Sequence, residues 1–181
     1  MKESLGLAPN SLELRGYDLR WPRLFLAEQA VLKKGLAPKI SEVLHIGSTA
    51  IPGMPAKPLL DMMAAVPDLG YVNCLDKGLR RLGYTCYGPV GVEDRLLFAK
   101  GPPGRPTHHL SFASLDSAFW REHLLFRDFL RISPLTAQRY KALKRMLLRR
   151  HRSNRRLYTA GKTEFVYHVL RMAERHFGHS D

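Results

Sequence analysis

Residues 45–66 read HIGSTAIPGMPAKPLLDMMAAV. The stretch combines a Gly47-Ser48 turn, a loop with three prolines, and an apolar run that carries one carboxylate, Asp61. Each proline fixes φ and removes a backbone donor, so the loop cannot continue as a helix. The almost uninterrupted apolar run over residues 59–66 is typical of a strand that is buried on both faces. A carboxylate in such a strand is costly unless it is paired or holds a metal ion.

The turn and the loop have the chemistry of a phosphate site. Gly47 has no Cβ, so the backbone there can approach a ligand closely. Ser48 and Thr49 supply hydroxyls and backbone N–H groups, and Lys57 adds a positive charge. A Gly-Ser turn by itself is most often only a turn, and an Asp near a strand end is often a cap. The combination with Lys57 and Asp61 favours a functional site.

The rest of the chain alternates between predicted strands and helices. Apolar residues at helical spacing predict helices over residues 21–34 and 71–82. Strands are expected at 12–14, 85–87, 95–100 and 107–113. Further helices are expected from Asp116 or Ser117 to about residue 132, from Pro134 onward, and over residues 155–177. We therefore expect a single α/β (α+β) domain over residues 1–181. Its sheet-bearing part covers about 12–113 and its helical layer about 116–178.

The strand at 107–113 carries the second candidate site. Alternation places His109 and Ser111 on one face, and His108, Leu110 and Phe112 on the other. Alternation alone does not decide which face is the core. A neutral histidine is a good ligand for a transition metal, and it is equally a partner for a structural carboxylate.

Bulk properties narrow the class of protein. Charged residues are 25% and hydrophobic residues 45% of the 181 residues, an ordinary globular composition. The net charge of +13 is uneven: residues 121–181 hold 15 Lys/Arg against 5 Asp/Glu. Such a field attracts anions and polyanions, although it is also compatible with a solvated helical surface. Cys74 and Cys86 have no metal-binding spacing, so we expect buried free thiols in a reducing, cytoplasmic compartment. No membrane span or signal peptide is expected.

These motifs resemble those of the GrpB family, whose fold is similar to the nucleotidyltransferase (polymerase-beta-like) superfamily. The resemblance rests on the block from His45 to Asp61 and on several shorter matches: Tyr17-Asp18 with Trp21-Pro22 and Phe25, Leu82-Gly83-Tyr84, Thr107-His108-His109-Leu110, residues 126–131, Tyr140 with Lys144, and Tyr158 with Lys162. Two positions depart from the pattern. Met63 stands where the superfamily has a second metal-binding carboxylate, and Ser111 stands where relatives have a second histidine of a His-x-His pair.

The resemblance implies a small mixed sheet flanked by helices, with a nucleotide or another phosphorylated small molecule bound between sheet and helical layer. The implied chemistry is nucleotidyl transfer assisted by Mg²⁺ or Mn²⁺. The predicted catalytic residues are Asp61, Ser48 and Lys57, and the predicted metal ligands are Asp61 and His109. The predicted ligand-binding residues are Gly47, Ser48, Thr49, Arg127, Lys144 and Lys162. Arginine suits bidentate contact with oxyanions and lysine a point contact.

Two alternatives belong to other classes of function. Met63 favours a non-catalytic binding or accessory domain, because two-metal chemistry needs carboxylates for both ions. Relatives attached to dephospho-CoA kinase link that alternative to coenzyme A metabolism by resemblance. The basic last third allows weak binding of RNA or DNA, although no aromatic series accompanies the charge. The sequence leaves open whether the protein is an enzyme, what its substrate and acceptor are, and its oligomeric state.

Overall fold

The computed structural model describes residues 5–7, 12–91 and 93–178. Five strands form one mixed sheet in the order β1-β2-β5-β4-β3. The strands are β1 (Val43–Ile46), β2 (Leu60–Ala65), β3 (Tyr84–Gly88), β4 (Leu96–Lys100) and β5 (His108–Ala113). Only the pairing of β2 with β5 is parallel, and the other three pairs are antiparallel. The expected α/β architecture is confirmed.

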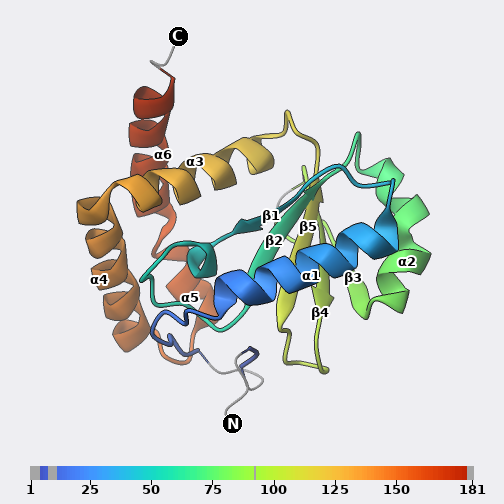
Figure 1. Ribbon diagram of the computed structural model, residues 1–181. Coiled ribbons are helices and arrows are strands. Elements are labelled where there is room, and N and C mark those ends of the chain that lie inside the picture. Colours follow the sequence, from blue (N-terminus) through green and yellow to red (C-terminus); the bar gives the residue numbers. More distant parts are fainter. Residues whose placement is uncertain (1–4, 8–11, 92, 179–181) are drawn as a thin grey trace.

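The alternating sides of β2 and β5 build two different cores. Leu60, Met62 and Leu110 pack under helix α1 (Trp21–Leu36), which crosses one face of the sheet (Figure 1). Residues of the opposite parity, including Met63 and Ala113, pack against helix α3 (Ala118–Ile132). The sheet is therefore covered on both faces, which is why β2 is apolar at almost every position.

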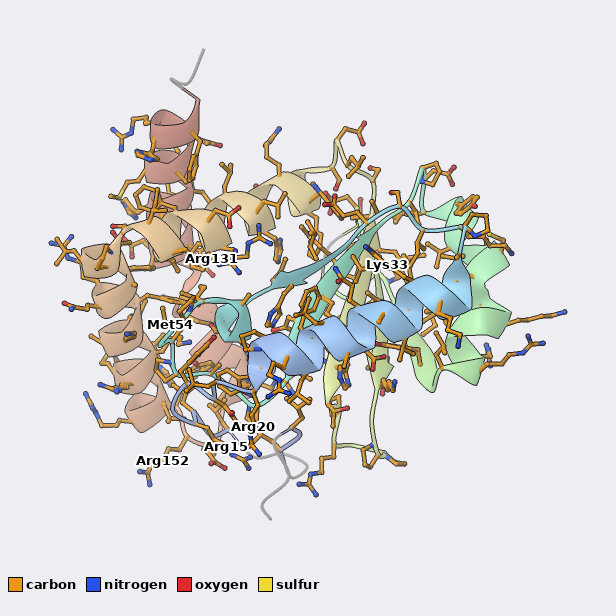
Figure 2. All side chains as sticks on the ribbon, in the orientation of Figure 1. Arg15, Arg20, Lys33, Met54, Arg131 and Arg152 are labelled. Atoms are coloured by element: carbon orange, nitrogen blue, oxygen red, sulfur yellow. The ribbon has the colours of Figure 1, made fainter. Side chains whose placement is uncertain are left out.

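The C-terminal third is helical, as expected. Helix α3 is capped by Ser117, whose hydroxyl accepts from the Trp120 N–H, and α4 (Pro134–Arg150) begins at a proline in its first turn. A third core joins α3, α4 and α6 (Thr163–Phe177) and includes Ile51 and Met54 from the proline-rich loop. These helices and helix α2 (Asp76–Arg81) lie at opposite ends of the molecule in Figure 1. Basic side chains project outward from α4 and α6 (Figure 2).

Several expected elements differ in detail. The helix expected over residues 155–177 is two helices, α5 (Arg155–Ala160) and α6, because the chain turns at Gly161. A Cβ at Gly161 would lie 2.5 Å from Leu147 Cδ2, so a side chain there would collide with α4. The helix expected over residues 71–82 is a 3₁₀ segment, η2 (Gly70–Leu75), followed by the short helix α2.

Two further expectations are wrong. Residues 12–14 form no strand, and the next residue, Arg15, makes an isolated bridge with Ala56. Both cysteines are exposed, because Cys74 lies on η2 and Cys86 on the outer strand β3. Among the described residues, no helix has the length and apolar character needed to cross a lipid bilayer.

Glu28 anchors α1 to the far edge of the sheet. Its buried carboxylate accepts from the Tyr84 hydroxyl at 2.9 Å and from Lys100 Nζ at 2.8 Å. We expect Tyr84→Phe to lower the free energy of unfolding by about 1.5–3 kcal/mol, because a hydrogen bond to a buried charged group is lost. Chemical denaturation measures this change. The control is Tyr87→Phe on the same strand, where the side chain is exposed. Equal stability of the two variants would contradict the anchoring role.

Candidate functional site

The Gly47 turn closes directly over Asp61. Gly47 has φ of 69°, and a Cβ at this position would lie 2.8 Å from Asp61 Oδ2. The strand pairing explains this contact, because Ile46 of β1 is opposite Asp61 of β2. The sequence predicted a close approach of the Gly47 backbone to a ligand. The structure shows a close approach of this backbone to the Asp61 carboxylate. Any residue with a side chain would displace that carboxylate.

Asp61 and His109 are neighbours across the parallel strand pair. Asp61 is opposite His109 in the register of β2 and β5, and Nδ1 of His109 lies 3.2 Å from Asp61 Oδ1. Burial raises the pKa of Asp61, but the hydrogen bond and the electrostatic interaction with His109, with a smaller contribution from His123, outweigh it and leave the pKa below its usual value. The Asp61 carboxylate, which was expected to need a partner, thus has one in His109.

Ser48 and Thr49 form the first turn after Gly47, in the 3₁₀ segment η1 (Ser48–Ala50). The Thr49 hydroxyl lies 2.9 Å from His45 Nε2 and donates to the Leu59 carbonyl, so it ties the turn to the loop. Burial lowers the pKa of His45 to about 4, so this histidine is neutral at physiological pH. The Ser48 hydroxyl instead accepts from Lys144.

Lys144 is the most deeply buried charged residue of the site. It lies on the apolar face of α4, one turn after Tyr140, and is only 2% exposed. Its Nζ donates to Ser48 Oγ at 2.9 Å and to the Pro55 carbonyl. Burial, reinforced by Lys162, Lys141 and Lys57, lowers its pKa to about 7. Lys144 forms no ion pair with a carboxylate among the described residues. A strongly shifted pKa in a cleft marks a candidate functional residue.

Two more lysines flank Tyr158. Nζ of Lys57 and of Lys162 lie 5.2 and 4.9 Å from the centroid of the Tyr158 ring. Burial, with repulsion from Arg155 and Lys162, lowers the pKa of Lys57 to about 8. Burial also lowers the pKa of Lys162. The aromatic face partly compensates both ammonium groups without neutralising them.

These groups line one cavity of about 220 Å³ between the sheet and α4–α5. Four of its side chains are cationic or basic: Lys57, Lys144, Arg155 and Lys162. Among the described residues that line it, Asp61 is the one carboxylate. The remaining polar lining comes from Ser48, Thr49, His109, Tyr158 and Thr159. The structure thus brings together most of the predicted site residues, and Gly47 lies immediately beside them over Asp61.

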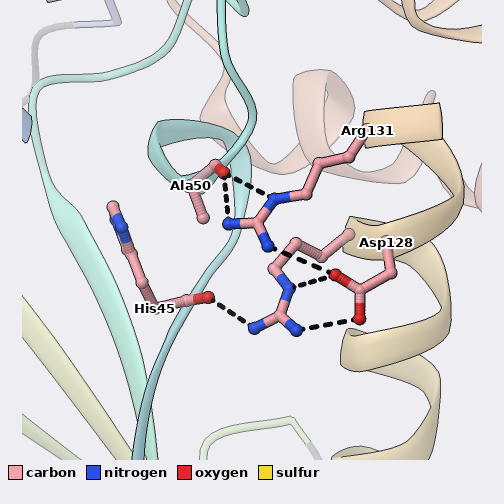
Figure 3. Close-up of polar contacts among 5 residues, drawn as sticks. His45, Ala50, Asp128 and Arg131 are labelled. Atoms are coloured by element: carbon pink, nitrogen blue, oxygen red, sulfur yellow. Dashed lines mark hydrogen bonds and ion pairs between the residues drawn. The ribbon is translucent and has the colours of Figure 1, made fainter. Parts of the chain in front are cut away.

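Arg127 lies apart from this cavity. Its guanidinium donates to both carboxylate oxygens of Asp128, at 2.7 and 2.8 Å, and to the His45 carbonyl at 3.0 Å. Arg131 donates to the Ala50 carbonyl and to Asp128 (Figure 3). Both arginines thus fasten α3 to the backbone of residues 45–50, and three of the five N–H donors of Arg127 are used in these contacts. Its predicted phosphate contact is not among the contacts that the structure shows.

Arg155 and Tyr158 are site residues that the sequence predictions did not select. Tyr158 precedes Lys162 by four residues, a spacing that marked both as one motif, and Arg155 begins the same helix. Lys144 lies between Tyr140 and Leu147 on the apolar stripe of α4. A lysine at such a position is a comparable sequence signal of a site residue.

The acidic groups do not fit a two-metal centre. Met63 is fully buried in the core under α3. Asp94 Oδ2 accepts from the Phe119 N–H at the start of α3, Glu93 is exposed, and neither lines the cavity. Within residues 5–7, 12–91 and 93–178, no group of three His, Cys, Asp or Glu side chains is placed to hold a metal ion. Glu93 and Asp94, the carboxylates just before β4, therefore do not take the place of the acid that Met63 lacks. A single Mg²⁺ or Mn²⁺ shared by Asp61 and ligand phosphates stays a prediction.

The buried lysines make stability depend on pH. An unfolded lysine has a pKa of about 10.4, whereas Lys144 and Lys57 have lowered values in the fold. Between about pH 7 and 10 the unfolded chain binds more protons, so the free energy of unfolding rises with pH through this window. We expect Lys144→Met to be at least as stable as the wild type at about pH 7 and to show a smaller rise toward about pH 9.5. Denaturant titrations at both pH values measure this.

Exposed Lys34 on α1 supplies the control Lys34→Met, which should keep the wild-type pH dependence. A loss of more than about 2 kcal/mol in Lys144→Met at both pH values would show that the bonds to Pro55 and Ser48 are structural.

Similar proteins cover nearly the whole chain. A model of the family described as GrpB protein matches residues 11–172. The crystal structure of the conserved protein GrpB from Enterococcus faecalis has 31% identity and a TM-score of 0.83, covering 91% of this chain and 99% of its own. The UPF0157 protein YqkA of Bacillus subtilis is 36% identical over 91% of this chain. The glutamate-rich protein GrpB of Alkalihalophilus pseudofirmus is 30% identical over 92% of this chain and 98% of its own.

This chain spans about half the length of YqkA, 48%, so that relative carries a further region. A cytoplasmic RNA terminal U-transferase also aligns with 73% of this chain, at 12% identity and a TM-score of 0.41, a likeness too distant to carry an argument. The family match over residues 11–172 includes the positions of Gly47, Asp61 and Lys162. The chain belongs to the GrpB family.

Proposed function

We propose that this protein binds a phosphorylated small molecule, most simply a nucleotide, by its phosphate groups in the cavity between the sheet and α4–α5. The observation that carries the proposal is the charge of the cavity lining. Lys144 is buried and Lys57 and Lys162 are half-buried, and burial lowers the pKa of all three. Natural folds rarely bury charges without a partner, so an anionic ligand is the missing counter-charge.

The shape of the site supports phosphate over a simple carboxylate. The three ammonium groups come from the loop, from α4 and from the junction of α5 and α6, so they approach the cavity from separate directions. Ser48 adds a hydroxyl on the sheet side. A phosphate chain presents oxygens in several directions and can meet such an array, whereas lysine acts as a point contact for each oxygen. Asp61 and His109 lie on the sheet side of the same cavity.

Catalysis by two metal ions lacks its acidic ligands among the described residues, as shown above. This observation favours the binding function over metal-dependent nucleotidyl transfer. An accessory role linked to coenzyme A, whose nucleotide part carries phosphates, uses the same cavity. Nucleic-acid binding by the exposed arginines of α4, such as Arg139 and Arg145, stays a weaker alternative, since no aromatic stacking platform accompanies them.

Calorimetry with ATP in EDTA tests the proposal. We expect binding at about pH 7 in wild type, and a loss of affinity of about tenfold or more in Lys144→Met and in Lys162→Met, because each variant removes one lysine that a bound phosphate keeps protonated. Lys34→Met should bind as wild type does. Coenzyme A and pyrophosphate are compared under the same conditions, and Mn²⁺ is added in a second series to test for an ion at Asp61.

The direction in which the affinity for ATP changes with pH gives a second test of the proposal. The terminal phosphate of ATP is already ionised at about pH 8, so the protein lysines dominate the change above it. A lysine binds anions while it is protonated, and Lys57 loses its proton near pH 8 in the free protein. Affinity should therefore fall as pH rises from about 8 to 9.5. Binding that is unchanged by pH and by both lysine variants would contradict the proposed site.

A further inference from the structure

A second cavity lies on the other side of Asp61 and His109. It measures about 260 Å³ and is bounded by the Gly47 turn and by the first turns of α3. Arg95, Ser111, Phe119 and His123 line it. Among the described residues, Asp61 and His109 are the two that line both this cavity and the lysine-rich one. Asp61 and His109 therefore lie between the lysine-rich cavity and the second cavity, which has fewer charged side chains.

The hydrogen bond between Asp61 and His109 fixes the tautomer of the histidine. An aspartate carboxylate is ionised at neutral pH, so that of Asp61 can only accept a hydrogen bond. Nδ1 of His109 must then carry the proton that lies between the two side chains, at 3.2 Å from Asp61 Oδ1. The lone pair of neutral His109 is consequently on Nε2, which makes no hydrogen bond within the described part of the chain. A carboxylate-oriented imidazole with a free Nε2 is the arrangement of a general base.

The second cavity has donors that suit a small hydroxylated molecule or water. Arg95 donates to Ser111 Oγ at 3.0 Å and to the Val90 carbonyl, and its guanidinium lies 5.2 Å from the Phe119 ring centroid. Its Nε is buried and has no partner among the described residues. His123 uses Nδ1 for the Phe119 carbonyl at 2.8 Å. An acceptor oxygen held by such groups would lie beside His109.

We propose that His109 is a catalytic general base that activates a hydroxyl group, of water or of a small alcohol in the second cavity, for attack on a phosphorus atom held in the lysine-rich cavity. This inference rests on the proposed function. Nε2 takes the proton of the attacking O–H group, a new O–P bond forms, and the phosphoanhydride P–O bond breaks. The leaving phosphate departs with the bonding electron pair as an anion beside Lys57, Lys144 and Lys162. His109 then returns the proton to solvent.

Such a reaction assigns the protein to metal-independent phosphoryl or nucleotidyl transfer, with hydrolysis as the form that needs no further substrate. His109 takes over the activation of the nucleophile, which in two-metal enzymes depends on ions held by carboxylates. The buried lysines supply the positive charge that stabilises the leaving group. The absence of a second acid at Met63 is then compatible with chemistry, because nothing in this step needs a second ion.

Release of phosphate and pyrophosphate from ATP, GTP, CTP and UTP in EDTA tests this inference. We expect wild type to hydrolyse at least one nucleotide, and His109→Asn to lower the turnover by about 100-fold or more, the usual contribution of a general base. The affinity of His109→Asn for ATP should stay within about threefold of wild type, which also shows that the variant is folded. If this variant does not fold, His109→Gln replaces it. The matched control is His108→Asn on the same strand, because His108 faces Glu28 on the opposite side of the sheet.

Equal product release by wild type and by His109→Asn, with ATP binding intact in both, would overturn the inference and leave the proposed function standing. The same holds if wild type binds ATP and releases no product, since water can enter a cavity of this size. Failure of wild type to bind any of the four nucleotides, coenzyme A or pyrophosphate would overturn the proposed function itself, and the general base with it.

Discussion

The parallel pairing of β2 with β5 is the constraint on which the candidate site depends. It sets Asp61 opposite His109, and the antiparallel pairing of β1 on the other side brings the Gly47 turn over the same carboxylate. A shift of one residue in either register would turn Asp61 into the core under α1 and expose Met62 in its place. The apolar residues on both faces of β2 prevent that shift, because they fill two cores that cannot exchange. The packing of the sheet therefore determines which side chains of β2 and β5 face the candidate site.

The helical layer supplies the opposite charge pattern. Three lysines from separate segments line the cavity that contains the Asp61 carboxylate. Their partial removal from water costs folding free energy. Arg127 and Arg131, in contrast, have their charged groups bonded within the protein, since they hold α3 against the backbone carbonyls of residues 45 and 50 (Figure 3). One set of cations is thus satisfied within the protein and fixes the geometry. The other set forms no ion pair with a carboxylate among the described residues, and that difference separates structural cations from candidate binding cations.

Much of this arrangement could be predicted from the sequence, because the signals are local. The prolines and Gly47 marked the loop, the apolar run marked β2, and Ser117 and Pro134 marked the starts of α3 and α4. Non-local facts were less accessible. The motif around Arg127 suggested a ligand contact, but its partner Asp128 is the next residue and its third contact is 82 positions away. The lack of room for a side chain at Gly161 comes from Leu147 of another helix, and the exposure of Cys86 depends on which strand lies at the sheet edge.

The central claim is that the buried lysines are the ligand contacts. A crystal structure of the protein grown with a non-hydrolysable ATP analogue tests it most directly. The account predicts phosphate oxygens within hydrogen-bonding distance, about 2.7–3.2 Å, of Nζ of Lys57, Lys144 and Lys162, on the helical side of Asp61 and His109. Phosphates bound instead by the exposed arginines of α4, with the three lysines unoccupied, would contradict it.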